Sequence, residues 1–113
     1  MGGAPVRPEQ VQVQSLGVHA LDMRRVDVAV DITPCVEPLN VEIVIVGPED
    51  EELCSVLLID TRDWMLDKIV HLRQDAESGE HMLHVGVFFE DRLVARAARR
   101  FVFAFGGRRD ELR

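Results

Sequence analysis

The sequence predicts an all-β domain, a sandwich of seven antiparallel strands, and three observations carry that prediction. Apolar and polar residues alternate with a period of two, most clearly over residues 25–32, where Val26, Val28, Val30 and Ile32 share one face. Similar segments recur toward the C-terminus. Turn-forming residues separate them at intervals of roughly 8 to 12 residues, a spacing typical of β-sandwiches.

Each expected strand lies between recognisable turn signals. Pro34 and Pro38 interrupt ladder hydrogen bonding after the second strand, so we expect the chain to cross there from one sheet to the other. Gly47-Pro48 and the Glu90-Asp91-Arg92 segment are typical of tight connections. The seven strands are expected at about 10–20, 25–33, 40–46, 53–60, 64–72, 81–90 and 93–105.

The fifth element has a competing interpretation. Apolar residues at i, i+4 and i+7, counted from Met65, fit an amphipathic helix over about 61–73 that Asp60 or Asp63 could cap. That helix would change the fold class to α+β. The alternation that begins at Trp64 fits a strand instead and completes a seven-stranded sandwich, so the strand is the preferred interpretation.

Length and composition describe one folded domain with charged ends. The chain has 113 residues, of which 47% are hydrophobic, and a single core is expected over 9–105. Residues 1–8 and 106–113 are rich in Gly, Pro or charge and are expected to be disordered tails. The net charge of −7 argues against nucleic-acid binding, although the C-terminal part is rich in arginine. No apolar run or leader sequence suggests a membrane or export, so a cytoplasmic location is expected.

No motif for catalysis, a cofactor or a metal rises above background. His81 and His84 are separated by an odd offset, which on a strand points them to opposite faces. Cys35 and Cys54 are expected to be reduced core residues. No serine lies in a G-x-S-x-G elbow, and the loop carboxylates lack the pattern of a calcium loop. We therefore expect no catalytic residues and no cofactor, and we expect that the protein is not an enzyme.

The order and spacing of the strands resemble immunoglobulin-like and fibronectin type III-like β-sandwiches. The segment 79–105, a glycine-led strand followed by a turn and a long final strand, is similar to the last hairpin of such domains. The chain also resembles small bacterial β-sandwich proteins that have no known activity. The similarity covers about residues 10–105 and implies a fold and no function. The absence of tyrosine and the late position of Trp64 depart from the antibody pattern.

One expected surface is more apolar than a solvent-exposed sheet face needs to be. If Ile43, Ile45, Val85 and Val87 face the core, the residues between them face outward from two strands that are neighbours in an immunoglobulin-like sheet. The outward set has an apolar centre and an arginine rim, which is the anatomy of a protein interface. The expected interface residues are Val44, Val46, Met82, His84, Phe88, Arg96 and Arg100.

Two functions therefore remain open. The first is a non-catalytic protein-interaction module that forms a homodimer or binds another protein through this sheet face. The alternative is a small-ligand or carbohydrate-binding module that uses the acidic loops at one end of the sandwich. The chain has one Trp and no Tyr to serve as aromatic platforms, which favours the first function.

Overall fold

The computed structural model describes residues 4–103, and it confirms the all-β class and the seven-stranded sandwich. Over those residues the only helical element is a short 3₁₀ turn, η1 (Pro8–Gln10). The strands are β1 (Val13–Ala20), β2 (Arg25–Ile32), β3 (Leu39–Val46), β4 (Glu52–Thr61), β5 (Met65–His71), β6 (Gly79–Phe89) and β7 (Arg92–Phe103).

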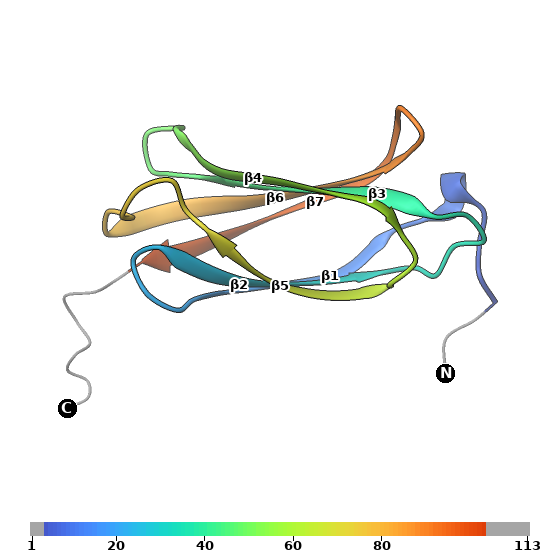
Figure 1. Cartoon of the computed structure of the whole chain (residues 1–113), viewed down its shortest axis with the longest axis horizontal. Coiled ribbons are helices and arrows are strands. Elements are labelled where there is room, and N and C mark those ends of the chain that lie inside the picture. The colour runs from blue at the N-terminus through green and yellow to red at the C-terminus, as the bar shows by residue number, and fades with distance from the viewer. Residues whose placement is uncertain (1–3, 104–113) are drawn as a thin grey trace.

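The strands form two antiparallel sheets that pack face to face (Figure 1). One sheet has the order β1-β2-β5 and the other has the order β4-β3-β6-β7. The chain crosses between the sheets after β2, at the segment that contains Pro34 and Pro38, as expected. Because β4 pairs with β3 rather than with β5, the order differs from that of antibody constant domains.

Within residues 4–103, no helix has the length and hydrophobicity needed to span a membrane.

The core consists of the inward residues that the alternation predicts. Every second residue of β2, β3 and the middle of β6 is buried, and Val28, Ile43 and Leu83 have no exposed surface. Phe89 is partly buried against the same core. This agreement follows from the period of two, since a slip of one residue would move a whole apolar set into water.

The fifth element is the strand β5, so the alternative helix over 61–73 is wrong. β5 pairs with β2 along its whole length, and this pairing sets Val70 against Val26 and Leu66 against Val30. Leu66 and Val70 are thereby buried, whereas Met65 and Ile69, which a helix would have buried, are exposed. The free edge of β2 supplies a ladder of hydrogen bonds that outweighs a weak local helical period.

Residues 4–8 fall in the expected N-terminal tail, and the structure places them against the β2–β3 connection. The backbone N–H of Val6 donates to the carbonyl of Pro34 at 2.8 Å, and Val36 N–H donates to the carbonyl of Val6 at 2.9 Å. Pro8 is buried. Residues 1–3 and the expected C-terminal tail, 106–113, lie outside the described residues.

Both cysteines are buried thiols at opposite ends of the sandwich. Cys35 precedes β3, and Cys54 pairs with Ile45 near the end of the same strand. The six-residue rise from Leu39 to Ile45 alone separates the two ends by about 20 Å along β3, well beyond disulfide distance. Burial raises the pKa of the Cys54 thiol, which keeps it protonated at neutral pH.

Candidate protein-interaction face

The outer surface of the β4-β3-β6-β7 sheet, called here the four-strand face, carries all seven residues expected at an interface. The pairing of β3 with β6 sets Val44 opposite His84 and Val46 opposite Met82. The pairing of β6 with β7 then continues the row from Met82 to Arg100. Val44, Val46 and Met82 are half-buried neighbours, so they form one apolar group with Arg100 beside it.

Phe88 and Arg96 lie farther along the same face. Arg96 pairs with Gly86, and Phe88 pairs with Leu93 across a register shift. A Cβ atom at Gly86 would lie 3.0 Å from Cε1 of Phe88 and 3.5 Å from Cδ1 of Leu93, so these two side chains cover the glycine. The second apolar group of the face is therefore a phenylalanine and a leucine that close over Gly86.

Leu93 was not expected on this face, because a β-bulge changes the alternation of β7. The register shifts between Val87 and Phe88, which leaves Val94 unpaired as the extra residue. Leu93 is thereby brought onto the four-strand face, where 45% of its surface is exposed. Counting alternate residues along β7 could not have located this shift.

Two strongly exposed apolar residues of the face lie on β4 and were also missed, and Val102 of β7, on the same face, is 59% exposed. Leu57 pairs with Glu42, an outward residue of β3, and is 56% exposed. Ile59 is 67% exposed. The signal was present in the sequence as three consecutive large apolar residues, Leu57-Leu58-Ile59, because such a run puts apolar side chains on both faces of a strand.

The cationic groups at the rim of this face form no ion pair with any of residues 4–103. Arg96, Arg100 and His84 are exposed, and within residues 4–103 neither arginine makes an ion pair. His84 and Arg96 line a hollow of about 380 Å³ together with Ala98. Two guanidinium groups and an imidazole beside apolar side chains can contact a protein surface that offers carboxylates.

The outer surface of the β1-β2-β5 sheet, called here the three-strand face, has a different chemistry. Its central strand presents half-buried Asp27 and Asp31 and exposed Ala29, which alternate with the buried inward valines. Ser15 Oγ donates to Oδ2 of Asp31 at 2.9 Å. His19 and His71 are exposed here, as expected for sheet-surface histidines.

A carboxyl pair lies on the three-strand face. Asp27 of β2 and Asp67 of β5 are diagonal neighbours in the ladder, since Asp27 pairs with Ile69 and Asp67 pairs with Ala29. A hydrogen bond with the Asp67 carboxyl group raises the pKa of Asp27, and desolvation and the charge of Asp67 act in the same direction. His19, which pairs with Asp27, partly offsets this effect.

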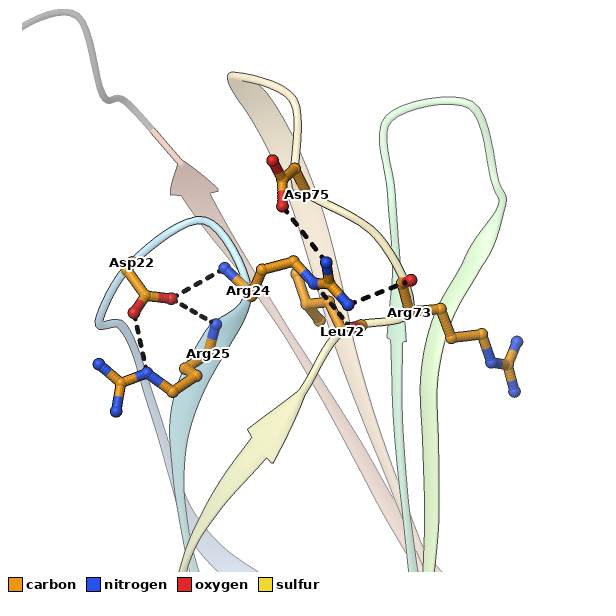
Figure 2. Close-up of polar contacts among 6 residues, drawn as sticks. All are labelled: Asp22, Arg24, Arg25, Leu72, Arg73 and Asp75. Atoms are coloured by element: carbon orange, nitrogen blue, oxygen red, sulfur yellow. Dashed lines mark hydrogen bonds and ion pairs between the residues drawn. The ribbon is translucent and has the colours of Figure 1, made fainter.

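Two loop carboxylates at one end of the sandwich, Asp22 and Asp75, bind arginines at the β1–β2 turn. Arg24, in the β1–β2 turn, reaches the β5–β6 connection (Figure 2). Its Nε donates to the carbonyl of Leu72 at 3.1 Å, its Nη2 donates to that of Arg73 at 3.4 Å, and its Nη1 lies 3.5 Å from Oδ1 of Asp75. This arginine clasp joins two turns that are 48 residues apart in sequence.

Asp22 organises the turn that presents the clasp. Its Oδ1 accepts hydrogen bonds from the backbone N–H of Arg24 at 2.9 Å and of Arg25 at 2.8 Å, and its Oδ2 accepts from Arg25 Nε at 2.8 Å. The backbone bond from Arg24 and the side-chain bond from Arg25 hold the pKa of Asp22 below its usual value. The Asp22 carboxylate therefore stabilises the β1–β2 turn through these three hydrogen bonds.

The histidine pair is split between the two sides of its sheet. His81 is buried, and its Nδ1 lies 3.0 Å from the carbonyl oxygen of Gly79, whereas His84 is exposed. The ring of His81 packs on Phe101 and Phe103, with centroid distances of 5.6 Å and 4.5 Å. Among the described residues, no group of three or more metal-ligating side chains converges.

Comparison with known proteins shows similarity of fold to part of larger enzymes. No family model and no curated protein matches the sequence. A β-glucuronidase from glycoside hydrolase family 2 matches 80% of this chain over 12% of its own, with a TM-score of 0.56 and 6% identity. A putative β-galactosidase from Bacteroides fragilis matches 81% of this chain over 17% of its own, with a TM-score of 0.55 and 9% identity.

A third solved structure gives the same result. A glycosyl hydrolase family 2 member from Bacteroides cellulosilyticus DSM 14838 matches 86% of this chain over 16% of its own, with a TM-score of 0.55 and 10% identity. The chain thus spans only 12% to 17% of the length of these three structures. At such low identity the likeness concerns the fold alone. The protein is a β-sandwich domain of the immunoglobulin-like type, similar to a part of each of these enzymes.

Proposed function

We propose that this protein is a non-catalytic protein-interaction domain that binds another folded domain through the four-strand face. One observation carries the proposal: exposed Leu57, Ile59 and Leu93 join half-buried apolar residues on a single face. Arg96 and Arg100 lie beside them and make no ion pair within the described part of the chain. An apolar centre of this kind costs free energy in water, on the order of 25 cal/mol for each Å² left exposed. A binding partner recovers that free energy.

The comparisons support a folded domain as the partner. In the three solved structures, a sandwich of this fold accounts for less than a fifth of a longer chain. A domain in that setting has neighbours to pack against, and interfaces between domains resemble protein–protein interfaces. The partner surface that fits is apolar at its centre and has carboxylates placed to meet Arg96 and Arg100.

A site-specific photo-crosslinker tests this proposal. A benzophenone side chain in place of Phe88 reports on the four-strand face, and the same group in place of Met65 is a matched control on the three-strand face. We expect one adduct of defined mass from position 88 in cells of the source organism, none from position 65, and loss of the adduct when Arg96 and Arg100 are changed to Glu. An adduct with a second copy of the chain supports an interaction domain of the self-associating kind.

Two results contradict the proposal. If position 88 gives no adduct, nothing contacts the face. If positions 65 and 88 give the same set of adducts, the contacts are nonspecific.

The second candidate, small-ligand binding, is favoured by a hollow of about 550 Å³ at the start of β5. Its wall includes Trp64, and Arg62, Asp63 and Asp31 contribute polar groups. Apolar surface with a few polar groups is typical of small-molecule sites. Trp64 is the single tryptophan of the chain, so its fluorescence reports directly on this hollow. A saturable change on titration with neutral or acidic sugars supports this candidate, and a flat response up to millimolar sugar contradicts it.

A further inference from the structure

The four edges of the two sheets are protected to different degrees. An exposed edge strand offers unpaired backbone groups to any other strand, and proteins commonly block it with charge, bulges or covering side chains. β1 and β5 are the edges of the three-stranded sheet, and β4 and β7 are the edges of the four-stranded sheet.

On one side of the sandwich, β7 and β1 protect each other. β7 carries four arginines, and one of them, Arg99, pairs with the buried Leu83 and so lies at an inward position. Its Nη1 donates to the carbonyl oxygen of Leu16 on β1 at 2.6 Å. The free edge of β1 is therefore occupied by an arginine from the opposite sheet.

On the other side, β5 is protected by the single lysine of the chain. Lys68 pairs with the fully buried Val28, so it occupies an inward position between the buried Leu66 and Val70. A strand that approached this edge would have to desolvate the ammonium group. An inward charge at mid-strand is a common device against edge pairing.

β4 has no such device along its middle, because the two register shifts of its ladder with β3 lie near its ends, at Leu53 and next to Asp60. Residues 53–59 (Leu-Cys-Ser-Val-Leu-Leu-Ile) contain no charge, proline or glycine. Within residues 4–103, the hydrogen bonds that β4 makes outside its ladder with β3 lie near its two ends. The carbonyl of Leu53 accepts from Arg73 N–H at 2.9 Å, and Asp60 N–H donates to Oδ1 of Asn40 at 2.9 Å. Between these ends lies an apolar, uncharged edge of the kind that pairs with another strand.

We propose that β4 pairs antiparallel with β4 of a second copy, with Leu57 on the two-fold axis, to form a continuous eight-stranded sheet. An antiparallel pair of identical strands is isologous, so one edge supplies both halves of the interface. In this register Ser55 lies opposite the partner's Ile59. Leu57 lies opposite the partner's Leu57, and apolar side chains meet on both sides of the sheet.

The charges at the two ends of β4 select this register. With Leu57 on the axis, Glu52 lies opposite the partner's Arg62, and the partner's Asp60 approaches Cys54, close to Arg73. Arg73 already holds Glu52, with Nη2 at 2.9 Å from Oε2, so both ends bring opposite charges together. A register centred on Val56 would instead set Glu52 against the partner's Asp60. Like charges directly opposite one another in a ladder are destabilising.

This proposal does not need the partner proposed for the four-strand face, although both proposals use Leu57 and Ile59. Pairing at β4 leaves Phe88 on β6 and Arg96 on β7 uncovered. It also places two four-strand faces side by side in one sheet.

A cysteine on the axis tests the register. Leu57→Cys would bring two thiols face to face, with Cα atoms about 5 Å apart, within disulfide range. We expect Leu57→Cys to form a covalent dimer at least tenfold faster in a glutathione redox buffer than Ser55→Cys, whose two thiols would be about 14 Å apart. Met65→Cys is the control for disulfides formed by random collision. Met65 lies on the edge strand β5 and is 79% exposed.

A charge swap provides a second, non-covalent test. Glu52→Arg and Arg62→Glu should each raise the dimer dissociation constant about tenfold in sedimentation equilibrium, because each places like charges together. The double variant should restore it. Circular dichroism verifies that each variant is folded.

Three outcomes would overturn the proposal. One is a wild-type protein that stays monomeric up to 500 μM, and another is a Leu57→Cys variant that oxidises no faster than the Met65→Cys control. The third is a dimer that Phe88→Glu dissociates while Leu57→Cys fails to cross-link, because that pattern belongs to face-to-face packing. The photo-crosslinking at position 88 is unaffected by the first two outcomes, so the two proposals fail separately.

Discussion

The two outer faces of the sandwich share one alternating pattern but differ in chemistry. The three-strand face presents Asp27 and Asp31 on its central strand, β2, and Asp67 on the edge strand β5, between the exposed Met65 and Ile69. The four-strand face carries apolar residues on all four strands, with exposed Leu57 and Ile59 on β4, and its arginines lie on β7. The alternation therefore determines which residues face outward from the core. The chemical identity of those outward residues then determines whether the face is suited to solvent or to a protein partner.

The largest expected effect separates inward from outward positions of the four-strand sheet. Val85→Glu should leave the domain unfolded, because it buries an unpaired carboxylate at a cost on the order of 4 kcal/mol or more. The neighbouring His84→Glu, at an exposed position, should remain folded. Urea denaturation followed by circular dichroism measures both. A folded Val85→Glu, or an unfolded His84→Glu, would show that the facing of β6 is misassigned.

A smaller effect separates the two faces themselves. Phe88→Ala should cost about 1 to 2 kcal/mol of unfolding free energy, because the ring that covers Gly86 is lost. Met65→Ala, at a residue that is 79% exposed, should change stability by less than about 0.5 kcal/mol. Thermal unfolding at matched concentrations compares them. Equal losses would mean that the apolar side chains of both faces pack alike.

A pH-dependent effect is expected only on the three-strand face. The folded-state pKa of Asp27 is raised, chiefly by its hydrogen bond with Asp67, so the folded protein binds this proton more tightly than the unfolded chain does. The resulting stability is fully present below the unfolded pKa of about 4 and is lost as pH rises through the higher folded value. Asp67→Asn removes the competing charge and should raise the melting temperature at pH 7.

The pH series tests the sign of this effect. Between pH 3.5 and pH 7 the melting temperature of Asp67→Asn should vary less than that of the wild type. Asp31→Asn is the control, because it changes another carboxylate of the same face, one that accepts a hydrogen bond from Ser15. Parallel curves for the wild type and Asp67→Asn would rule out the carboxyl pair as the cause.

The smallest expected effect concerns the arginines. Arg96→Ala and Arg100→Ala should each change the free energy of unfolding by less than about 0.5 kcal/mol, since both are exposed and make no ion pair within residues 4–103. Arg24→Ala should cost about 1 kcal/mol or more, because it opens the arginine clasp. A large loss at Arg96 or Arg100 would indicate a structural role and weaken the case for a binding role.

Much of the fold followed from the sequence because the decisive signal was local. The period of two located the strands and oriented Val44, Met82 and Phe88 correctly. Features that depend on pairing across strands were missed. The bulge that turns Leu93 outward and the diagonal contact between Asp27 and Asp67 both require the register of a neighbouring strand, which a single segment does not encode. Whether the face binds a protein stays a prediction.

The two buried thiols, Cys35 and Cys54, can be used to measure local opening of the fold without an added label. Cys35 lies beside the N-terminal segment that Val6 attaches, and Cys54 lies at the start of the β4 edge. Because each thiol must be uncovered before it reacts, the rate of alkylation at each measures how often that end of the sandwich opens. Mass spectrometry distinguishes the two sites without any engineered label. Slower alkylation of Cys54 at higher protein concentration would then record association at β4 in the unmodified chain.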